Sequence, residues 1–94
     1  MAAGLLDAWR EITCPVVGML HLPALPGSPA FGGSWQEIET AVLRDAEALV
    51  EGGLHGLLLE NYGDVPFLPG RVSSEVVACM TACAVAVRKR FRVP

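Results

Sequence analysis

The stretch VVGMLHLPALPG, residues 16–27, is a short apolar run that carries one histidine at its far end and then breaks into a proline-rich loop. A second stretch, LLLENYGDVPF at residues 57–67, echoes it, because its apolar run ends in a carboxylate and an amide. Both runs predict buried parallel strands, over residues 16–22 and 57–59, with polar groups at their carboxyl ends. In an α/β barrel, the carboxyl ends of the strands form the face where chemistry is done. The two stretches therefore predict where a site lies.

Alternation along the first strand divides its side chains between two faces. Val17, Met19 and His21 share one face, whereas Leu20 and Leu22 share the other. If the first face is the interior of a barrel, His21 is the last inward residue before the loop. The proline- and glycine-rich loop that follows suits a stiff, shaped rim.

An amphipathic helix is predicted after each strand. Ser34 begins the first helix, Glu37 three residues later completes a capping box, and Gly52 and Gly53 end it. Ser73 caps the second helix. The predicted buried stripe of the second helix consists of Val76, Val77, Met80, Cys83, Ala84, Val87 and Phe91.

Two shorter segments flank this β-α-β-α core. Residues 1–13 form a predicted leader, in which Leu5, Leu6, Trp9 and Ile12 recur at helical spacing. We therefore expect a short amphipathic helix over residues 4–12 that can cap the bottom of a barrel. After the second helix, residues 93–94 are predicted to open a third strand.

The fold class predicted from this order is α/β, namely a leader helix followed by β-α-β-α as the first part of an incomplete (β/α)8 TIM-type barrel. A complete barrel needs about 250 residues, so the 94 residues supply roughly its first third. We treat residues 1–94 as one partial domain, either a fragment or an isoform. Because two strands leave open sheet edges, we expect an oligomer or the remainder of the barrel to be needed for stability.

Charge and hydropathy restrict the classes of partner. The net charge of −3 argues against nucleic acid, which usually calls for a basic domain. The basic residues at 88–90 and 92 fall at the end of the second helix, where cations complement the helix dipole. No apolar run approaches the roughly 18 residues of a membrane span, and no signal pattern precedes the fold. We therefore expect a soluble intracellular protein, in the cytoplasm or an organelle.

The sequence predicts no cofactor and no metal site. Cys14, Cys79 and Cys83 form neither a CxxC pair nor an even set, and no histidine lies near them in sequence to complete a zinc site. We interpret them as small buried thiols. Metallohydrolase barrels typically offer two histidines one residue apart, whereas His21 is followed by Leu22. Neither glycine-rich phosphate-binding pattern occurs.

Four polar residues are delivered to one rim by this topology: His21, Glu60, Asn61 and Asp64. A histidine near a carboxylate can act as general acid or base, and Glu60 could equally be the base. Asn61 could donate a hydrogen bond to a developing oxyanion. His55 precedes the second strand and receives no catalytic role.

A structural interpretation of the same residues stays open. A histidine at a strand end can simply satisfy a loop carbonyl, and an aspartate beside a glycine is a common turn former, as at Asp64. Polar groups at the end of an apolar strand are costly to bury without a purpose, which favours function for His21 and Glu60.

Together, PVVGMLHLPALPGSP and LLLENYGDVPF resemble the amino-terminal signature of the BtpA family, including the intervening helix with Asp45, Ala46 and the double glycine. The resemblance covers nearly all of the chain from Cys14 onward. It implies a TIM-type barrel related to the ribulose-phosphate-binding group. The residues that match the two motifs are His21, Pro23, Pro26 and Gly27, and then Glu60, Asn61, Gly63, Asp64 and Phe67.

The resemblance implies two functions for the parent protein. The first is a barrel enzyme or binder of a phosphorylated or sugar-like metabolite, with His21 and Glu60 in acid–base roles. The second is a non-catalytic biogenesis or assembly factor, because the family takes its name from photosystem I biogenesis in cyanobacteria, where a member associates peripherally with membranes. Such barrels usually bind phosphate at the loops after the seventh and eighth strands. We therefore expect the 94-residue chain alone to be inactive.

Overall fold

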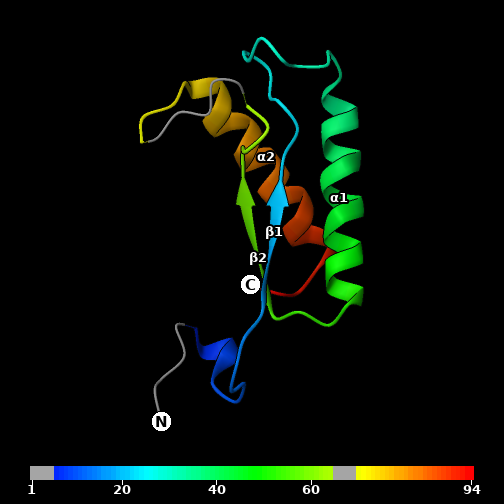
Figure 1. Cartoon of the computed structure of the whole chain (residues 1–94), viewed down its shortest axis with the longest axis vertical. Coiled ribbons are helices and arrows are strands. Elements are labelled where there is room, and N and C mark those ends of the chain that lie inside the picture. Colours follow the sequence, from blue (N-terminus) through cyan, green and yellow to red (C-terminus); the bar gives the residue numbers. More distant parts are fainter. Residues whose placement is uncertain (1–5, 65–69) are drawn as a thin grey trace.

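The computed structural model describes residues 6–64 and 70–94 of the chain (Figure 1). The fold class is α/β, and the predicted β-α-β-α order is confirmed. The elements in chain order are the 3-10 helix η1 (Asp7–Trp9), β1 (Val17–His21), α1 (Trp35–Glu51), β2 (Gly56–Glu60) and α2 (Ser74–Arg90). This order of elements is consistent with the opening units of a (β/α)8 barrel.

The sheet consists of β1 and β2, which pair in parallel (Figure 1). The register runs from Val17 opposite Gly56 to His21 opposite Glu60. The pairing continues past the strand ends, because the Leu22 amide donates to the Glu60 carbonyl at 2.9 Å. The last residues of the two strands are therefore fixed side by side.

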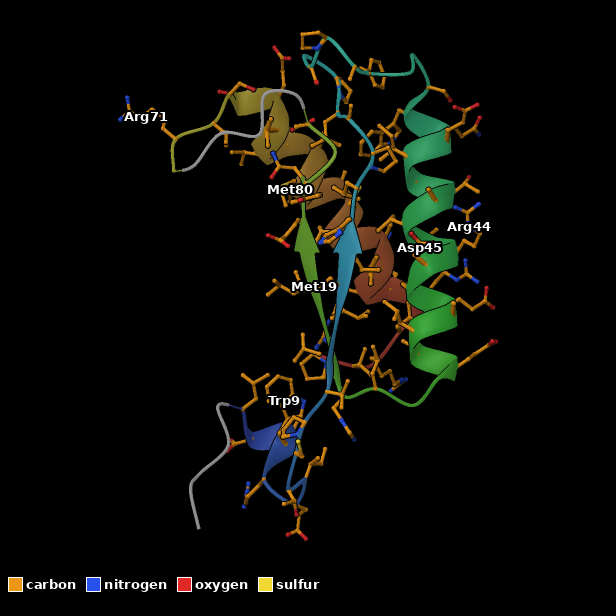
Figure 2. The ribbon with its side chains drawn as sticks, viewed as in Figure 1. Trp9, Met19, Arg44, Asp45, Arg71 and Met80 are labelled. Atoms are coloured by element: carbon orange, nitrogen blue, oxygen red, sulfur yellow. The ribbon has the colours of Figure 1, made fainter. Side chains whose placement is uncertain are left out.

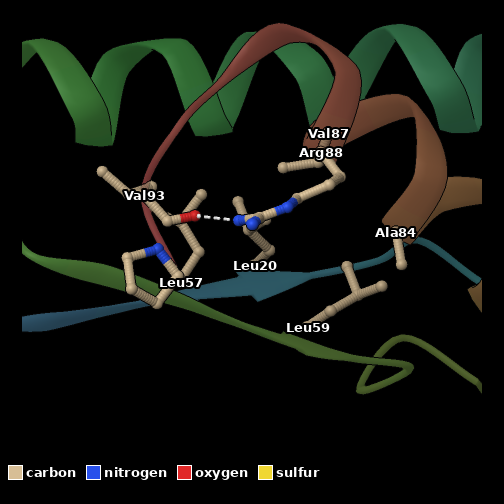
Figure 3. A pocket seen from close by; sticks show the side chains of 8 residues that line it. Leu20, Leu57, Leu59, Ala84, Val87, Arg88 and Val93 are labelled. Atoms are coloured by element: carbon tan, nitrogen blue, oxygen red, sulfur yellow. Dashed lines mark hydrogen bonds between the residues drawn. The ribbon is translucent and has the colours of Figure 1, made fainter. Parts of the chain in front are cut away.

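The two faces of the sheet have different environments. One face carries Leu20, which is only 2% exposed and belongs to the hydrophobic core. The other face carries Val17, Met19 and Leu58, which are 42%, 41% and 49% exposed. Both helices pack on the Leu20 face, as Figure 3 shows from close by. The predicted sharing of one face by Val17, Met19 and His21 is confirmed, and within residues 6–64 and 70–94 neither α1 nor α2 packs on this helix-free face.

The core lies between the helices and the sheet. It contains residues from β1, the loop after it, α1 and α2. Its buried members are Leu20, Leu22, Leu25, Ile38, Val42, Ala46 and Cys83. The loop after β1 is thus an integral part of the core, because Leu22 and Leu25 are 1% and 0% exposed.

Both helices begin where the sequence predicts. The Ser34 hydroxyl accepts a hydrogen bond from the Glu37 amide at 3.3 Å, and the Ser73 hydroxyl accepts one from the Val76 amide at 3.4 Å. These bonds satisfy amides that have no partner within the helix. At the other end of α1, Gly53 takes the left-handed conformation with φ +89°.

The predicted buried stripe of α2 is only partly right. Cys83 is fully buried, and Val76, Met80, Val87 and Phe91 pack partly buried against the core. Val77, in contrast, is 57% exposed, and Ala84 is also exposed. The reason is that α2 packs against α1 and one edge of a two-stranded sheet, so the described chain covers only part of its apolar surface.

The leader differs from the predicted amphipathic helix. Residues 4 and 5 lie outside the described residues, and the described part forms only the single 3-10 turn η1. So short a segment gains too little from helix propagation to form a stable α-helix. Trp9 is held by a tertiary contact instead, since its Nε1 donates to the His55 carbonyl at 2.7 Å and its ring lies against Gly56. Figure 2 shows Trp9 at the amino-terminal end of the strands, where the leader was expected to form a cap.

After α2 the chain returns to the free edge of β2. The Leu57 amide donates to the Pro94 carbonyl at 2.8 Å, and the Arg88 guanidinium donates to the Val93 carbonyl at 3.2 Å. The first bond places Pro94 beside β2, but residues 91–94 form no strand, so the third strand stays a prediction. An apolar cavity of about 170 Å³ lies next to this edge, between α2 and the strands (Figure 3). It opens on the Leu20 face of the sheet and not on the face that carries His21 and Glu60.

Candidate functional site

His21 and Glu60 are in contact at the carboxyl ends of β1 and β2. They are register partners in the sheet, and 3.3 Å separates Nε2 of His21 from Oε1 of Glu60. Their side chains are 49% and 35% exposed, so both remain accessible to a ligand. The carboxylate also fixes which imidazole nitrogen faces the protein. This is the arrangement that orients a histidine for proton transfer.

Nε2 is the nitrogen of His21 that faces Glu60, and Nδ1 is the other nitrogen of the half-exposed ring. Among residues 6–64 and 70–94, no hydrogen bond engages this atom. When Nε2 carries its proton towards Glu60, Nδ1 is an unprotonated base. The pair can therefore take a proton at Nδ1 and stabilise the resulting charge through Glu60.

Tyr62 completes the surroundings of His21, although the sequence pattern did not predict this contact. Its ring stacks on the imidazole with centroids 4.7 Å apart and planes inclined by 24°. Glu60 thus contacts the edge of the imidazole, whereas Tyr62 covers one of its faces. The only signal in the sequence is the spacing of two residues after Glu60, and turn geometry makes that spacing a weak guide to side-chain direction.

The loops that follow the two strands are in direct contact. The Gly63 amide donates to the Leu22 carbonyl at 3.0 Å. A Cβ added to Gly63 would lie 2.5 Å from that oxygen and 2.9 Å from the Pro23 carbonyl carbon, so only glycine permits this approach. The position matched by the family motif therefore has a steric reason to be glycine.

Asp64 joins the same two loops through its side chain. Oδ1 accepts a hydrogen bond from the Leu25 amide at 2.7 Å, and Oδ2 accepts one from the Asn61 side-chain amide at 2.8 Å. Asp64 is only 6% exposed. The structure thus brings all four predicted residues to one rim, but as two separate pairs. The His21–Glu60 pair is accessible. The Asn61–Asp64 pair instead joins the loops that follow β1 and β2.

His55 lies at the opposite, amino-terminal end of the strands. Its Nδ1 accepts a hydrogen bond from the Val16 amide at 2.9 Å, and its own amide donates to the Val16 carbonyl at 2.8 Å. The imidazole therefore secures the entry to β1. This placement away from the rim is the one predicted.

The three cysteines lie in different environments. Burial raises the pKa of the Cys83 thiol to about 11, from an ordinary value of 9.0. Burial, and then the nearby Glu75 carboxylate, raise the pKa of Cys79. Cys83 is fully buried, as predicted, but Cys14 is exposed, so the prediction of a buried thiol is wrong there. The cause is the position of Cys14 in the connection between η1 and β1, outside the core.

No group of three or more histidine, cysteine, aspartate or glutamate side chains within residues 6–64 and 70–94 could hold a metal ion. In the same part of the chain, no helix has the length and apolar character required to cross a membrane.

Comparison with known proteins identifies relatives over most of the chain. The model of the BtpA family matches residues 12–94. An uncharacterised protein of Pyrococcus furiosus is 40% identical over 80 residues, which cover 85% of this chain and 30% of that protein. An uncharacterised protein of Archaeoglobus fulgidus is 49% identical over 74 residues, covering 79% and 29% of the two chains. The photosystem I biogenesis protein BtpA of Synechocystis is 40% identical over 67 residues, covering 71% and 23%.

The chain matches only part of the length of its relatives. It spans about 30% of the length of the archaeal relatives that it matches. No solved structure matches the chain. The activity and partners of a protein of the relatives' full length are therefore matters for proposal.

Proposed function

The chain belongs to the BtpA family, and from that premise we propose that its parent protein is a TIM-barrel enzyme or binder that acts on a phosphorylated or sugar-like metabolite. The rim that carries His21 and Glu60 is its site. The observation that carries this proposal is the accessible contact between these two side chains, 3.3 Å apart at the carboxyl ends of paired parallel strands. In barrels, this end of the strands is where catalytic groups gather.

His21 and Glu60 act as one proton-transfer unit in this proposal. Glu60 holds Nε2 of the imidazole, so that Nδ1 accepts a proton from the ligand or donates one to it. Tyr62 stacks on the ring and keeps the plane of the imidazole in place. The alternative assignment has Glu60 as the base and His21 as its orienting partner. Either assignment requires both side chains, because a general acid–base pair contributes about 10²–10⁴-fold to the rate only when it is held in position.

The chain supplies only part of such a site. In barrels, phosphate is usually bound by loops after the seventh and eighth strands. We expect the 94 residues alone to lack turnover and to need the rest of the barrel. The exposed apolar side chains on the helix-free face support that expectation, since Val17, Met19 and Leu58 are each more than 40% exposed.

A second candidate function is a non-catalytic assembly factor for membrane protein complexes, with peripheral membrane association. It is favoured by the name of the Synechocystis relative, a photosystem I biogenesis protein. This function predicts dependence on surface residues and not on the rim. A rim variant that folds but loses complex assembly would count against it.

A chimera tests the first function on this chain's own residues. The chain replaces the matching 80-residue segment of the Pyrococcus furiosus relative, and the product is screened for binding and turnover against sugar phosphates, free sugars and nucleosides. His21→Gln and Glu60→Gln each remove one member of the pair. Glu47→Gln is the matched control, because Glu47 is an exposed residue of α1.

The expected result is a loss of turnover of about 10²-fold or more in both rim variants, with the control unchanged. If the screen yields only a bound ligand, the rim variants should weaken its binding. Equal turnover and equal binding in the chimera and in His21→Gln would remove His21 from the mechanism.

A further inference from the structure

We infer that Asp64 is a positioning residue, which together with Asn61 ties the loop after β2 to the loop after β1 and so keeps the Tyr62 ring stacked on His21, beside Glu60. We call the Leu25 amide, the Asn61 side chain and the Asp64 carboxylate the rim latch. His21 and Glu60 count as the reactive pair only under the proposed function. The rim latch is a property of the chain without ligand.

The first support is the way that Asp64 uses both of its oxygens. Oδ1 accepts from the Leu25 amide across 39 positions of sequence, at 2.7 Å in a buried setting. Oδ2 accepts from the Asn61 side chain at 2.8 Å, and the Asp64 amide donates to the Asn61 carbonyl at 3.0 Å. A carboxylate is an acceptor-only group, so it suits two facing N–H donors. One side chain therefore joins both loops.

The second support is burial. Asp64 is 6% exposed, whereas the Glu60 side chain is 35% exposed. A buried carboxylate is costly unless it is hydrogen-bonded. In the described residues, no buried side-chain nitrogen or oxygen lacks a partner. Asp64 is thus placed to hold structure together, and Glu60 is placed to meet a ligand.

The third support is that the loops tied by the rim latch directly follow His21 and Glu60 in the chain. Leu22 directly follows His21, and its carbonyl accepts from the Gly63 amide at 3.0 Å. Leu22 and Leu25 are themselves 1% and 0% exposed, so the loop after β1 is anchored in the core. Asp64 fixes the loop after β2 to this anchored segment. A shift of that loop would therefore move Tyr62, which covers one face of the imidazole, relative to His21.

The test is a set of variants of the 94-residue chain followed by NMR. Asp64→Ala removes both side-chain hydrogen bonds. Asn61→Asp places a second carboxylate against Asp64, and the double variant N61D/D64N restores a donor and an acceptor with their roles exchanged. Asp45→Asn is the control, because Asp45 lies midway along α1 (Figure 2), in an exposed contact with Arg44.

Two signals are measured in each variant. The first is the rate of hydrogen exchange at the Leu25 amide relative to the amides of β1. The second is the nuclear Overhauser contact between the rings of His21 and Tyr62, which general loss of stability in a folded variant would not weaken selectively. We expect exchange at Leu25 to be about tenfold faster or more in D64A and N61D, as for a lost bond to a charged acceptor. The ring contact should weaken in both.

Rescue is the decisive outcome. N61D/D64N should return the exchange rate of Leu25 and the His21–Tyr62 contact close to those of the parent, and D45N should leave both unchanged. If D64A or N61D does not fold, recovery of a folded chain by the double variant serves as the same rescue. A double variant as perturbed as N61D, or unchanged signals in D64A and N61D, would overturn the inference. Turnover is not measured, so the proposed function can fail while the rim latch holds.

Discussion

Replacing Gly63 with alanine tests the contact between the two rim loops most sharply. The added Cβ would lie 2.5 Å from the Leu22 carbonyl oxygen, 2.9 Å from the Pro23 carbonyl carbon and 3.0 Å from the Ala24 nitrogen. All three atoms belong to the backbone, so no side-chain rotation can relieve the overlap. The loop after β2 must move away from the loop after β1 to admit the methyl group.

The magnitude follows from the size of that movement. Ordinary van der Waals contact begins at 3.4 Å, so the loops must separate by about 1 Å. Overpacking of this kind costs about 1–3 kcal/mol, and stretching the bond from the Gly63 amide to Leu22 adds about 1 kcal/mol. The lower entropy of alanine in the unfolded chain returns about 0.4–1 kcal/mol. We therefore expect a net destabilisation of roughly 1–3 kcal/mol.

Thermal unfolding followed by circular dichroism, at one fixed protein concentration, measures this effect. A loss of 1 kcal/mol lowers Tm by about 4–8 °C in a domain of this size. Gly32→Ala is the matched control, because nothing lies within 4 Å of its added Cβ. The control should melt at or slightly above the parent temperature. A Gly63→Ala chain that melts with the parent and the control would refute the close approach of the loops.

Three further predictions concern the rest of the molecule. Trp9→Phe should cost about 1 kcal/mol in thermal unfolding, because the bond from Nε1 to the His55 carbonyl is lost; an unchanged Tm would contradict it. Leu25→Ala should cost about 2–5 kcal/mol in the same assay, since this side chain is fully buried, and a loss below that range would place Leu25 outside the core. At pH 8 a thiol reagent should modify Cys14 rapidly and Cys83 only after unfolding, because Cys83 is buried with its pKa raised to about 11; rapid modification of Cys83 in the folded chain would contradict its burial.

Local chemistry in the sequence determines the element boundaries well. Ser34 and Ser73 cap their helices because a hydroxyl before an amphipathic run satisfies free amides, whatever the tertiary context. The placement of His21 and Glu60 on one rim was also predictable. Parallel strands bring their carboxyl ends together, and the register then sets the two side chains opposite each other.

Features that depend on packing between distant segments could not be predicted in the same way. Helical spacing in the leader favoured a helix, but the contact of Trp9 with His55 and the shortness of the segment decided its structure. The stacking of Tyr62 on His21 depends on the path of a turn, which alternation does not describe. The buried role of Asp64 depends on the Leu25 amide, 39 positions away in sequence.

The stability of the chain on its own remains a prediction. Two kinds of group are normally covered by neighbouring strands or helices in a folded sheet. They are the apolar side chains on the helix-free face and the unpaired backbone amides and carbonyls along the outer edge of β1. A cooperative urea transition of the isolated, monomeric chain would show that neither an oligomer nor the remainder of a barrel is needed. We expect instead a transition whose midpoint depends on protein concentration.

The most direct measurement of the central claim is a double-mutant cycle on turnover by the chimera with the Pyrococcus furiosus relative. His21→Gln, Glu60→Gln and the double variant are compared with the parent. If the two side chains act as one unit, the double variant should be little slower than the slower single variant, because either change already disables the pair. Losses that add within about 0.5 kcal/mol, or single variants as fast as the parent, would contradict a shared role for His21 and Glu60.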